Sequence, residues 1–256
     1  MNDDAILALA ERLIPSVKEA GRFIMDVYRR HPSTHMKADG SPVTEADCGA
    51  EDIILPALEA AAPAIQIISE ENAQSHDLPP ASQFFLVDPL DGTKEFLRPG
   101  GQGAFTVNIG LIVDRQPVMG IIYAPALGRL FYGSRNRGAF EIVSGQAQPI
   151  AVRDIVADDM VAVTSASHRD PETDAWLCQN KVTNTVAIGS SLKFCLIAAG
   201  EADAYPRYGP TMEWDTAAGD AILRAAGGRV MDAAGAPYLY GKTGYLNTPF
   251  FAFGSV

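Results

Sequence analysis

The sequence has few cysteines and no long hydrophobic run, and both shortages exclude classes of protein. Only three of its 256 residues are cysteine, and none forms a Cys-x-x-Cys pair. Zinc ribbons and disulfide frameworks need such clusters, so a reducing compartment is expected. No apolar run reaches the ~18 residues that cross a bilayer. The start, MNDDAILALAERL, has acids where a signal peptide carries Lys or Arg. These absences predict a cytoplasmic protein without a transmembrane segment.

Basic residues are also scarce relative to acidic ones. The chain carries 20 Lys and Arg against 31 Asp and Glu, which gives a formal net charge of −11. A broad basic face that binds polymeric nucleic acid is therefore excluded. A small phosphorylated molecule stays a candidate ligand, provided that metal ions supply the positive charge. The hydrophobic fraction of 47% is typical of a globular enzyme.

The first half of the chain shows two helical patterns followed by a series of strands. Apolar residues recur at helical spacing over roughly 1–30, where Pro15 predicts a kink or a break, and again over roughly 46–61. A short strand is expected at 65–69. Runs rich in β-branched and aromatic residues predict further strands at 105–113, 118–125, 129–135 and 138–143. Their close spacing favours antiparallel pairing.

From about residue 150, strands and helices alternate instead. Strands are expected at 160–166, 183–190 and 202–207, and helices at 171–180, 191–200 and 215–228. We therefore predict an α+β protein with two halves, 1–150 and 151–256. No linker sequence separates the halves, so they are expected to pack together.

An acidic motif, VDPLDGT, follows a hydrophobic run in the first half. Asp88 and Asp91 stand three residues apart, which like-charge repulsion makes costly unless something positive lies between them. An Asx turn would explain one aspartate and Gly92. A divalent-cation site would explain both aspartates, because hard cations take carboxylate and carbonyl oxygens. Pro89 is expected to stop the strand and to free the carbonyl of Leu90 as a further ligand.

The residues after this motif suit a phosphate. Gly92 and Thr93 would open a helix or turn whose free N–H groups can bind a phosphate oxygen. Aspartate-nucleophile phosphatases also follow an apolar run with Asp, Gly and Thr, but their aspartates stand two residues apart and usually near the N-terminus. The spacing here is three, a third of the way along the chain. A covalent aspartyl-phosphate is therefore set aside.

Together with other segments, these motifs resemble the inositol monophosphatase superfamily of Mg²⁺-dependent, lithium-sensitive phosphatases. The closer resemblance is to its 3′(2′),5′-bisphosphate nucleotidase branch, of the CysQ type. The matching segments are DGSPVTEAD, IISEE, LVDPLDGTKEF, FTVNI, YAP, SASH, GSSLKFC and YPRYGPTMEWDTAAGDAIL. The resemblance implies a layered αβαβα sandwich with an N-terminal antiparallel sheet and a C-terminal mixed α/β half. It also implies two or three Mg²⁺ ions per active site.

The resemblance assigns a role to each acidic residue. Glu70 would bind the first metal and act in catalysis, Asp88 would bridge two metals, and the carbonyl of Leu90 would complete the first site. Asp91 and Asp215 would hold the second metal. Without the resemblance, Glu70 would be interpreted as a solvated loop acid, and Asp215 as the N-cap of the helix TAAGDAIL.

Asp47 and Thr93 resemble the pair that orients the attacking water. A Thr hydroxyl is a weak base alone, but one held by a carboxylate can align a water molecule. From the residues alone, TEAD is a helix start with Thr44 as the N-cap and Asp47 three residues further on.

Substrate contacts are expected from both halves of the chain. The residues that the resemblance implies are Lys37, Gly92, Thr93, His168, Ser191, Lys193, Arg207 and Asp215. Arg207 and Lys193 could bind a second phosphate, and His168 could stack or hydrogen-bond near a base. The alternatives are a solvated loop lysine at Lys37, an exposed helix residue at Lys193 and a polar strand-end residue at His168.

The implied reaction removes the 3′-phosphate of 3′-phosphoadenosine 5′-phosphate, giving AMP, by metal-activated water and without a phosphoenzyme. Its role would be to clear this by-product of sulfate assimilation. The alternatives are an inositol 1-phosphate or sugar monophosphatase of the same fold and, more remotely, a catalytically silent binding protein. A monomer and a homodimer both stay open, and the resemblance also allows peripheral association with the inner membrane.

Overall fold

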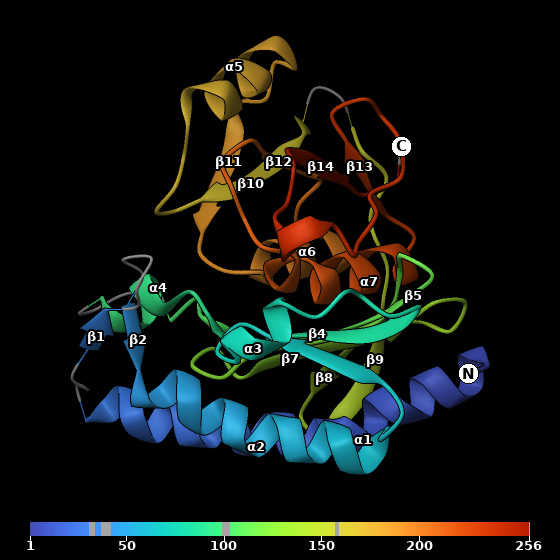
Figure 1. Ribbon diagram of the computed structural model, residues 1–256. Coiled ribbons are helices and arrows are strands. Elements are labelled where there is room, and N and C mark those ends of the chain that lie inside the picture. Colours follow the sequence, from blue (N-terminus) through green and yellow to red (C-terminus); the bar gives the residue numbers. More distant parts are fainter. Residues whose placement is uncertain (31–33, 37–41, 99–102, 157–158, 256) are drawn as a thin grey trace.

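The chain folds into five layers, in the order helix, sheet, helix, sheet, helix (Figure 1). The computed structural model describes residues 1–30, 34–36, 42–98, 103–156 and 159–255. The predicted α+β class and αβαβα layering are confirmed. No helix in this described part of the chain has both the length and the hydropathy that crossing a membrane requires.

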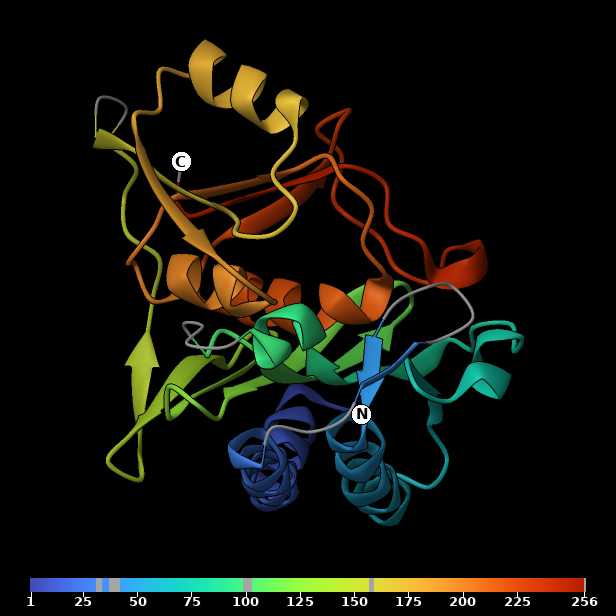
Figure 2. The same cartoon turned by 90° about the vertical axis from the view of Figure 1, so that its left-hand side faces the viewer.

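Two long helices, α1 (Asp3–Arg29) and α2 (Glu45–Ala61), lie side by side on one face of a seven-stranded sheet (Figures 1 and 2). The strand order is β3-β4-β5-β6-β7-β8-β9. β3 is parallel to β4, and the other neighbours are antiparallel. The bounds are β3 (Gln66–Ser69), β4 (Gln83–Asp91), β5 (Thr106–Val113), β6 (Gln116–Ala124), β7 (Arg129–Ser134), β8 (Gly138–Val143) and β9 (Gln146–Ile150).

The helices α6 (Leu192–Ala198) and α7 (Ala217–Ala225) form the middle layer (Figure 2). A five-stranded sheet of order β11-β10-β12-β14-β13 covers them, and α5 (Pro171–Gln179) lies outermost. The bounds are β10 (Val161–Ser165), β11 (Asn184–Ile188), β12 (Ala204–Arg207), β13 (Arg229–Asp232) and β14 (Phe250–Phe253). The short elements are β1 (Thr34–Met36), β2 (Pro42–Thr44), α3 (Ala73–His76), α4 (Thr93–Leu97), η2 (Glu213–Asp215) and η3 (Thr243–Tyr245).

Two strand glycines let α7 approach the larger sheet closely. A Cβ on Gly120 would lie 2.1 Å from the carbonyl oxygen of Ala218, and a Cβ on Gly110 would lie 2.8 Å from the Cβ of Ala217. Any larger residue would push the helix away from the sheet. The start of α7 directly follows Asp215, so this close packing also sets the distance between that residue and β4 and β5.

Of the kink or break predicted at Pro15, the break is wrong, because α1 continues through this residue as one helix. Pro15 is exposed, whereas Leu13 and Val17 are buried on the face that packs on the sheet. Water can therefore bind the carbonyl that loses its helical partner, and burial of the apolar face stabilises the helix on either side.

The prediction that Pro89 ends its strand is also wrong. β4 continues to Asp91, and its pairing with β5 shifts register between Asp88 and Asp91. Asp88 pairs with Asn108 and Asp91 pairs with Thr106, so β4 has one more residue than β5 in this interval. Proline is tolerated in such a bulge because the extra residue makes no ladder hydrogen bond. The bulge carries both aspartates of the motif.

One apolar cluster contains residues from both sides of residue 150. Phe84 and Leu86 of β4 share it with Leu192 and Phe194 of α6, and with Ile222 of α7. A second cluster lies between α1, α2 and the opposite face of the larger sheet. The division into 1–150 and 151–256 stays a prediction.

Candidate active site

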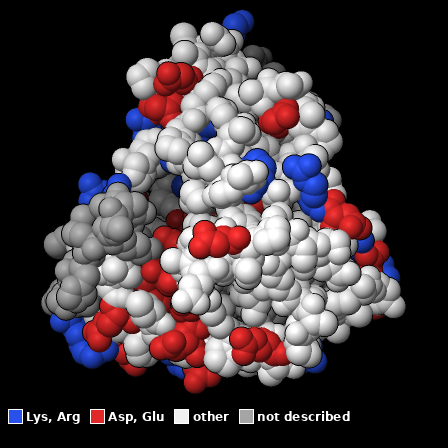
Figure 3. Space-filling view, in the orientation of Figure 1, with Lys and Arg blue, Asp and Glu red and all other residues white. Residues whose placement is uncertain are grey.

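A cavity of about 380 Å³ lies where β4 and α4 meet β12, α6 and η2. Figure 3 shows a hollow on this face, with acidic side chains at its visible edge. Most residues predicted for the site line the cavity: Glu70, Asp88, Leu90, Asp91, Gly92, Thr93, His168, Ser191, Lys193, Arg207 and Asp215. Asp47 contacts Thr93 without lining the cavity, and Lys37 lies outside the described residues.

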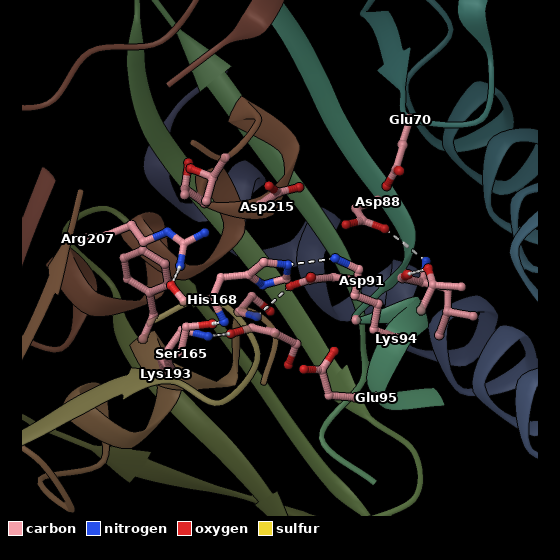
Figure 4. Close-up of a pocket in the computed structure, with 18 of the residues that line it drawn as sticks. Glu70, Asp88, Asp91, Lys94, Glu95, Ser165, His168, Lys193, Arg207 and Asp215 are labelled. Carbon is pink, nitrogen blue, oxygen red and sulfur yellow. Dashed lines mark hydrogen bonds between the residues drawn. The ribbon is translucent and has the colours of Figure 1, made fainter. Parts of the chain in front are cut away.

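Three carboxylates from separate segments converge on one side of this cavity. Glu70 follows β3, Asp88 lies in β4 and Asp215 lies in η2, and one oxygen of each lies within 4.8 Å of the others. Figure 4 shows these side chains pointing toward one another. Carboxylate oxygens at such separations are the donors that a hard divalent cation takes, so the residues fit a metal ion.

The electrostatics of this cluster favour a cation. Burial, and then repulsion from Glu70, Asp91 and Asp215, raises the pKa of Asp88 well above its usual value. Burial, and then repulsion from Asp91 and Glu70, does the same to the pKa of Asp215. A bound cation would remove this penalty, because an opposite charge nearby favours the ionised carboxylates.

Asp91 lies beside this group and reaches across to the second half of the chain. Its Oδ2 accepts the backbone N–H of Ser191 at 2.5 Å. Burial raises the pKa of Asp91 to about 6, although the Lys193 ammonium and the Ser191 amide act in the opposite direction. Among the described residues, Asp91 is not one of the three carboxylates whose oxygens lie within 4.8 Å of one another, so its role as a ligand of a second metal stays a prediction.

The two interpretations of the aspartate motif turn out to be compatible. Asp88 Oδ1 accepts the N–H of Leu90 at 3.0 Å, which is the Asx turn that local sequence suggested. The same carboxylate belongs to the acidic cluster. The turn holds the bulge in shape, and Gly92, with φ of 92°, provides the left-handed residue that starts α4.

Asp47 and Thr93 lie within hydrogen-bonding distance although 46 residues separate them. Thr93 Oγ1 donates to Asp47 Oδ1 at 3.2 Å. Asp47 Oδ2 accepts the backbone N–H and the hydroxyl of Thr44, both at 2.8 Å. The predicted helix start is confirmed, since Thr44 and Asp47 form a capping box for α2. Because both carboxylate oxygens of Asp47 accept hydrogen bonds, its side chain is held in a fixed orientation next to Thr93.

Asp215 is not the N-cap of the following helix, as the local sequence suggested, because Thr216 holds that position in α7. Asp215 closes the short helix η2 instead, where its Oδ2 accepts the N–H of Met212 at 2.7 Å. The neighbouring Glu213 is fully buried and accepts the N–H groups of Gly241 and Lys242 at 2.8 and 2.9 Å. These contacts fix η2 from two sides.

Lys193 and Arg207 lie on the side of the cavity away from Glu70 and Asp88 (Figure 4). Lys193 is buried, not exposed, and its Nζ donates to the carbonyls of Ser190 and Ile188 at 2.6 and 3.2 Å. Burial lowers the pKa of Lys193 to about 8, against the opposing effect of Asp91. Arg207 donates to three backbone carbonyls, of His168, Gly209 and Pro210, each at 3.1 Å.

The side chain of Ser191 faces the larger sheet. Its hydroxyl lies 2.6 Å from Asn108 Oδ1 and 2.8 Å from Thr106 Oγ1, both on β5. With its N–H on Asp91, Ser191 thus ties the start of α6 to β4 and β5. These contacts describe a residue that positions Asp91.

Several residues that line the cavity were not predicted from the sequence. Lys94 Nζ donates to His168 Nε2 at 2.8 Å, and Glu95 accepts the hydroxyl of Ser167 at 2.6 Å, so α4 contacts the turn after β10. Burial is the main cause that lowers the pKa of His168, and the positive charges of Lys94 and Arg207 act in the same direction. A lowered pKa agrees with a neutral ring that accepts the hydrogen bond from Lys94. Tyr205 also lines the cavity. Its spacing of two from Arg207 on a strand was the available signal.

Fold and site together are those of a metal-dependent phosphatase with its acidic cluster at the edge of the larger sheet. A family model described as the inositol monophosphatase family matches residues 7–251, so the chain belongs to that family, which is metal-dependent.

Curated relatives span almost the whole chain. The 3′(2′),5′-bisphosphate nucleotidase CysQ of Salmonella typhimurium is 42% identical over 246 residues, covering 94% of this chain and 98% of that protein. The protein of the same name from Escherichia coli K12 is 41% identical over the same length, with the same coverage.

Solved structures agree with this family. CysQ from Bacteroides thetaiotaomicron superposes with a TM-score of 0.80 at 36% identity, covering 96% of this chain and 97% of that chain. The extragenic suppressor protein suhB from Bartonella henselae gives 0.79 at 27% identity, covering 96% of this chain and 94% of that chain.

Proposed function

We propose that the protein is a 3′(2′),5′-bisphosphate nucleotidase that removes the 3′-phosphate of 3′-phosphoadenosine 5′-phosphate and releases AMP. The observation that carries this proposal is one cavity with an acidic cluster on one side and buried cations on the other. A ligand with two phosphates can use both sides, whereas a monophosphate needs only the first. The near full-length similarity to relatives bearing that name supports it. In a cytoplasm that assimilates sulfate, the reaction would clear a by-product.

The acidic residues are proposed to hold Mg²⁺, in two or three sites. Glu70, Asp88 and the Leu90 carbonyl would hold the first ion, and Asp91 and Asp215, together with Asp88, would hold the second. When bound, the ions would attract the phosphate and stabilise charge that develops on its oxygens. Without them the cluster would repel the substrate.

The reaction needs a water aligned with the phosphorus atom. The Thr93 hydroxyl lies 3.2 Å from Asp47 Oδ1 and 3.3 Å from the Leu90 carbonyl oxygen, so it can donate its proton to one of them while its own oxygen accepts a hydrogen bond from that water. Glu70 would take the one proton that the water loses and would later release it to solvent. The N–H groups of Gly92 and Thr93 would bind a phosphate oxygen. A new P–O bond then forms from the water as the bond to the 3′-oxygen breaks, and the 3′-oxygen takes a proton from solvent.

Nucleotide contacts are proposed for His168, Lys193 and Arg207, which line the cavity opposite the acidic cluster. Two of the three Lys193 donors and three of the five Arg207 donors already bind carbonyls, so each cation keeps donors for a phosphate. The contacts of Ser191 support a positioning role in place of a direct one.

Lys94 is expected to contribute to the second phosphate. Its ammonium has a neutral ring as its partner in the cavity, so an anion can replace that ring at little cost. Lys94→Ala should raise KM for the bisphosphorylated nucleotide about tenfold, because hydrogen bonds to charged groups contribute about 1.5–3 kcal/mol. KM for inositol 1-phosphate, measured alongside, should change little. Arg98→Ala is the control, since Arg98 carries the same charge close by without lining the cavity.

The proposal is tested by phosphate release from 3′-phosphoadenosine 5′-phosphate and from inositol 1-phosphate, each measured with Mg²⁺. A clear preference for the nucleotide supports it. A preference for inositol 1-phosphate would move the protein to the monophosphatase activity of the same fold. Release from neither substrate, nor from sugar phosphates, would favour a catalytically silent binding protein.

A further inference from the structure

His76 contacts the segment that carries Glu70 and the segment that carries Asp215, the two members of the acidic cluster that lie outside β4. It ends α3, after the turn that follows Glu70. Nothing in its sequence surroundings, NAQSHDL, suggests a functional residue.

On one side, the ring of His76 is hydrogen-bonded to the backbone carbonyl of Ser69, the residue just before Glu70. His76 Nε2 lies 2.8 Å from the carbonyl oxygen of Ser69, and because a carbonyl only accepts, Nε2 carries the proton. Ser75 supports the same turn, since its hydroxyl accepts the N–H of Ser69 at 3.1 Å. Glu70 itself continues the strand pairing, donating its N–H to Val87 at 3.1 Å.

On the other side, the ring is stacked on the residue just before Asp215. The centroids of His76 and Trp214 are 4.7 Å apart, and their planes are inclined by 24°. Trp214 is 4% exposed and also packs on Tyr245, at 6.2 Å between centroids. The Tyr245 hydroxyl donates to the Leu78 carbonyl at 2.9 Å, a second link to the segment after α3.

Resting on the proposed function for its metal site, we propose that His76 is a positioning residue that fixes the separation of Glu70 and Asp215. Glu70 directly follows Ser69, whose carbonyl binds the His76 ring. Asp215 directly follows Trp214, on which the same ring stacks. One oxygen each of Glu70, Asp215 and Asp88 lie within 4.8 Å of one another. Their mutual repulsion tends to separate them when no cation is bound. The His76 ring opposes this separation, so the site is preorganised for the ion.

The test measures binding of Mn²⁺, used as a hard probe cation, to the substrate-free protein by electron paramagnetic resonance of the free ion. His76→Ala removes both contacts and should raise the dissociation constant about tenfold, as is typical when a residue that orients metal ligands is lost. His76→Phe keeps an aromatic ring without the donor, and His76→Gln keeps a donor without the ring. Each should give a smaller increase than His76→Ala.

Gln74→Ala is the matched control, because Gln74 is an exposed residue of the same short helix. It should bind Mn²⁺ like the parent. Melting of the metal-free proteins checks folding, and if His76→Ala unfolds, the Phe and Gln variants carry the test. At saturating metal, KM for substrate should be unchanged in every folded variant, which separates positioning of the ion from damage to the cavity.

Folded His76 variants that bind Mn²⁺ as tightly as the parent would overturn the inference. Because this readout needs no substrate, it is separable from the proposed function. A parent that binds the ion but releases no phosphate from the nucleotide contradicts the proposed function alone.

Discussion

Replacing Asp91 with Asn is expected to lower phosphate release about a thousandfold while the protein stays folded. Loss of a metal ligand removes several kcal/mol of transition-state stabilisation, and about 4 kcal/mol corresponds to this factor. The side-chain oxygen of Asn can still accept the N–H of Ser191, which lies 2.5 Å from Asp91 Oδ2. Steady-state turnover at saturating Mg²⁺ is the measurement, and near-normal turnover would refute the role of Asp91.

The same substitution should stabilise the metal-free protein at neutral pH. Burial raises the pKa of Asp91 from 3.8 to about 6, with Lys193 opposing. Because the folded pKa is above the unfolded one, the stability that Asp91 contributes is fully present below about pH 4 and is lost as the pH rises through about 6. In EDTA, the gain in Tm of Asp91→Asn over the parent should therefore shrink as the pH falls from about 7 to about 5. A gain independent of pH would contradict this account.

Thr93→Val is expected to lower kcat about a hundredfold, the usual contribution of one group that positions a proton transfer. Valine keeps the shape of threonine but loses the oxygen that Asp47 holds at 3.2 Å. Thr93→Ser is the matched control, because it restores a hydroxyl at the same place. The measurement is single-turnover phosphate release at saturating Mg²⁺.

The metal dependence separates this effect from damage to the acidic cluster. Thr93 supplies no carboxylate, so the Mg²⁺ concentration for half-maximal rate should be the same in the Val variant and the parent. Equal rates for the Val and Ser variants would show that the hydroxyl is not needed, and the Asp47–Thr93 pair would then lose its role.

Local patterns in the sequence predicted the elements that depend on nearby residues. The capping box of Thr44 and Asp47 and the strands β5 to β8 follow from residues close in the chain. The course of β4 past Pro89 did not follow, because the bulge exists only through its pairing with β5. The unbroken α1 likewise depends on packing against the sheet, which outweighs the local cost of Pro15.

For the candidate site, the sequence alone reached Asp88 and Asp91, which one motif contains. Glu70 and Asp215 were reached only through the family resemblance, since their convergence with Asp88 depends on tertiary structure. The burial of Lys193 reversed the interpretation that its helical position alone favours. His76 could not be found from sequence, because its importance lies in a stack with a residue 138 positions later.

The central claim is that the acidic cluster acts on the 3′-phosphate of a bisphosphorylated nucleotide while the cations opposite hold the other phosphate. The most direct test follows the reaction with 3′-phosphoadenosine 5′-phosphate by ³¹P nuclear magnetic resonance in the presence of Mg²⁺. The account predicts that the 3′-phosphate signal is replaced by inorganic phosphate while the 5′-phosphate signal persists as AMP, and that EDTA abolishes the change. Formation of adenosine 3′-phosphate, or an unchanged rate in EDTA, would contradict it.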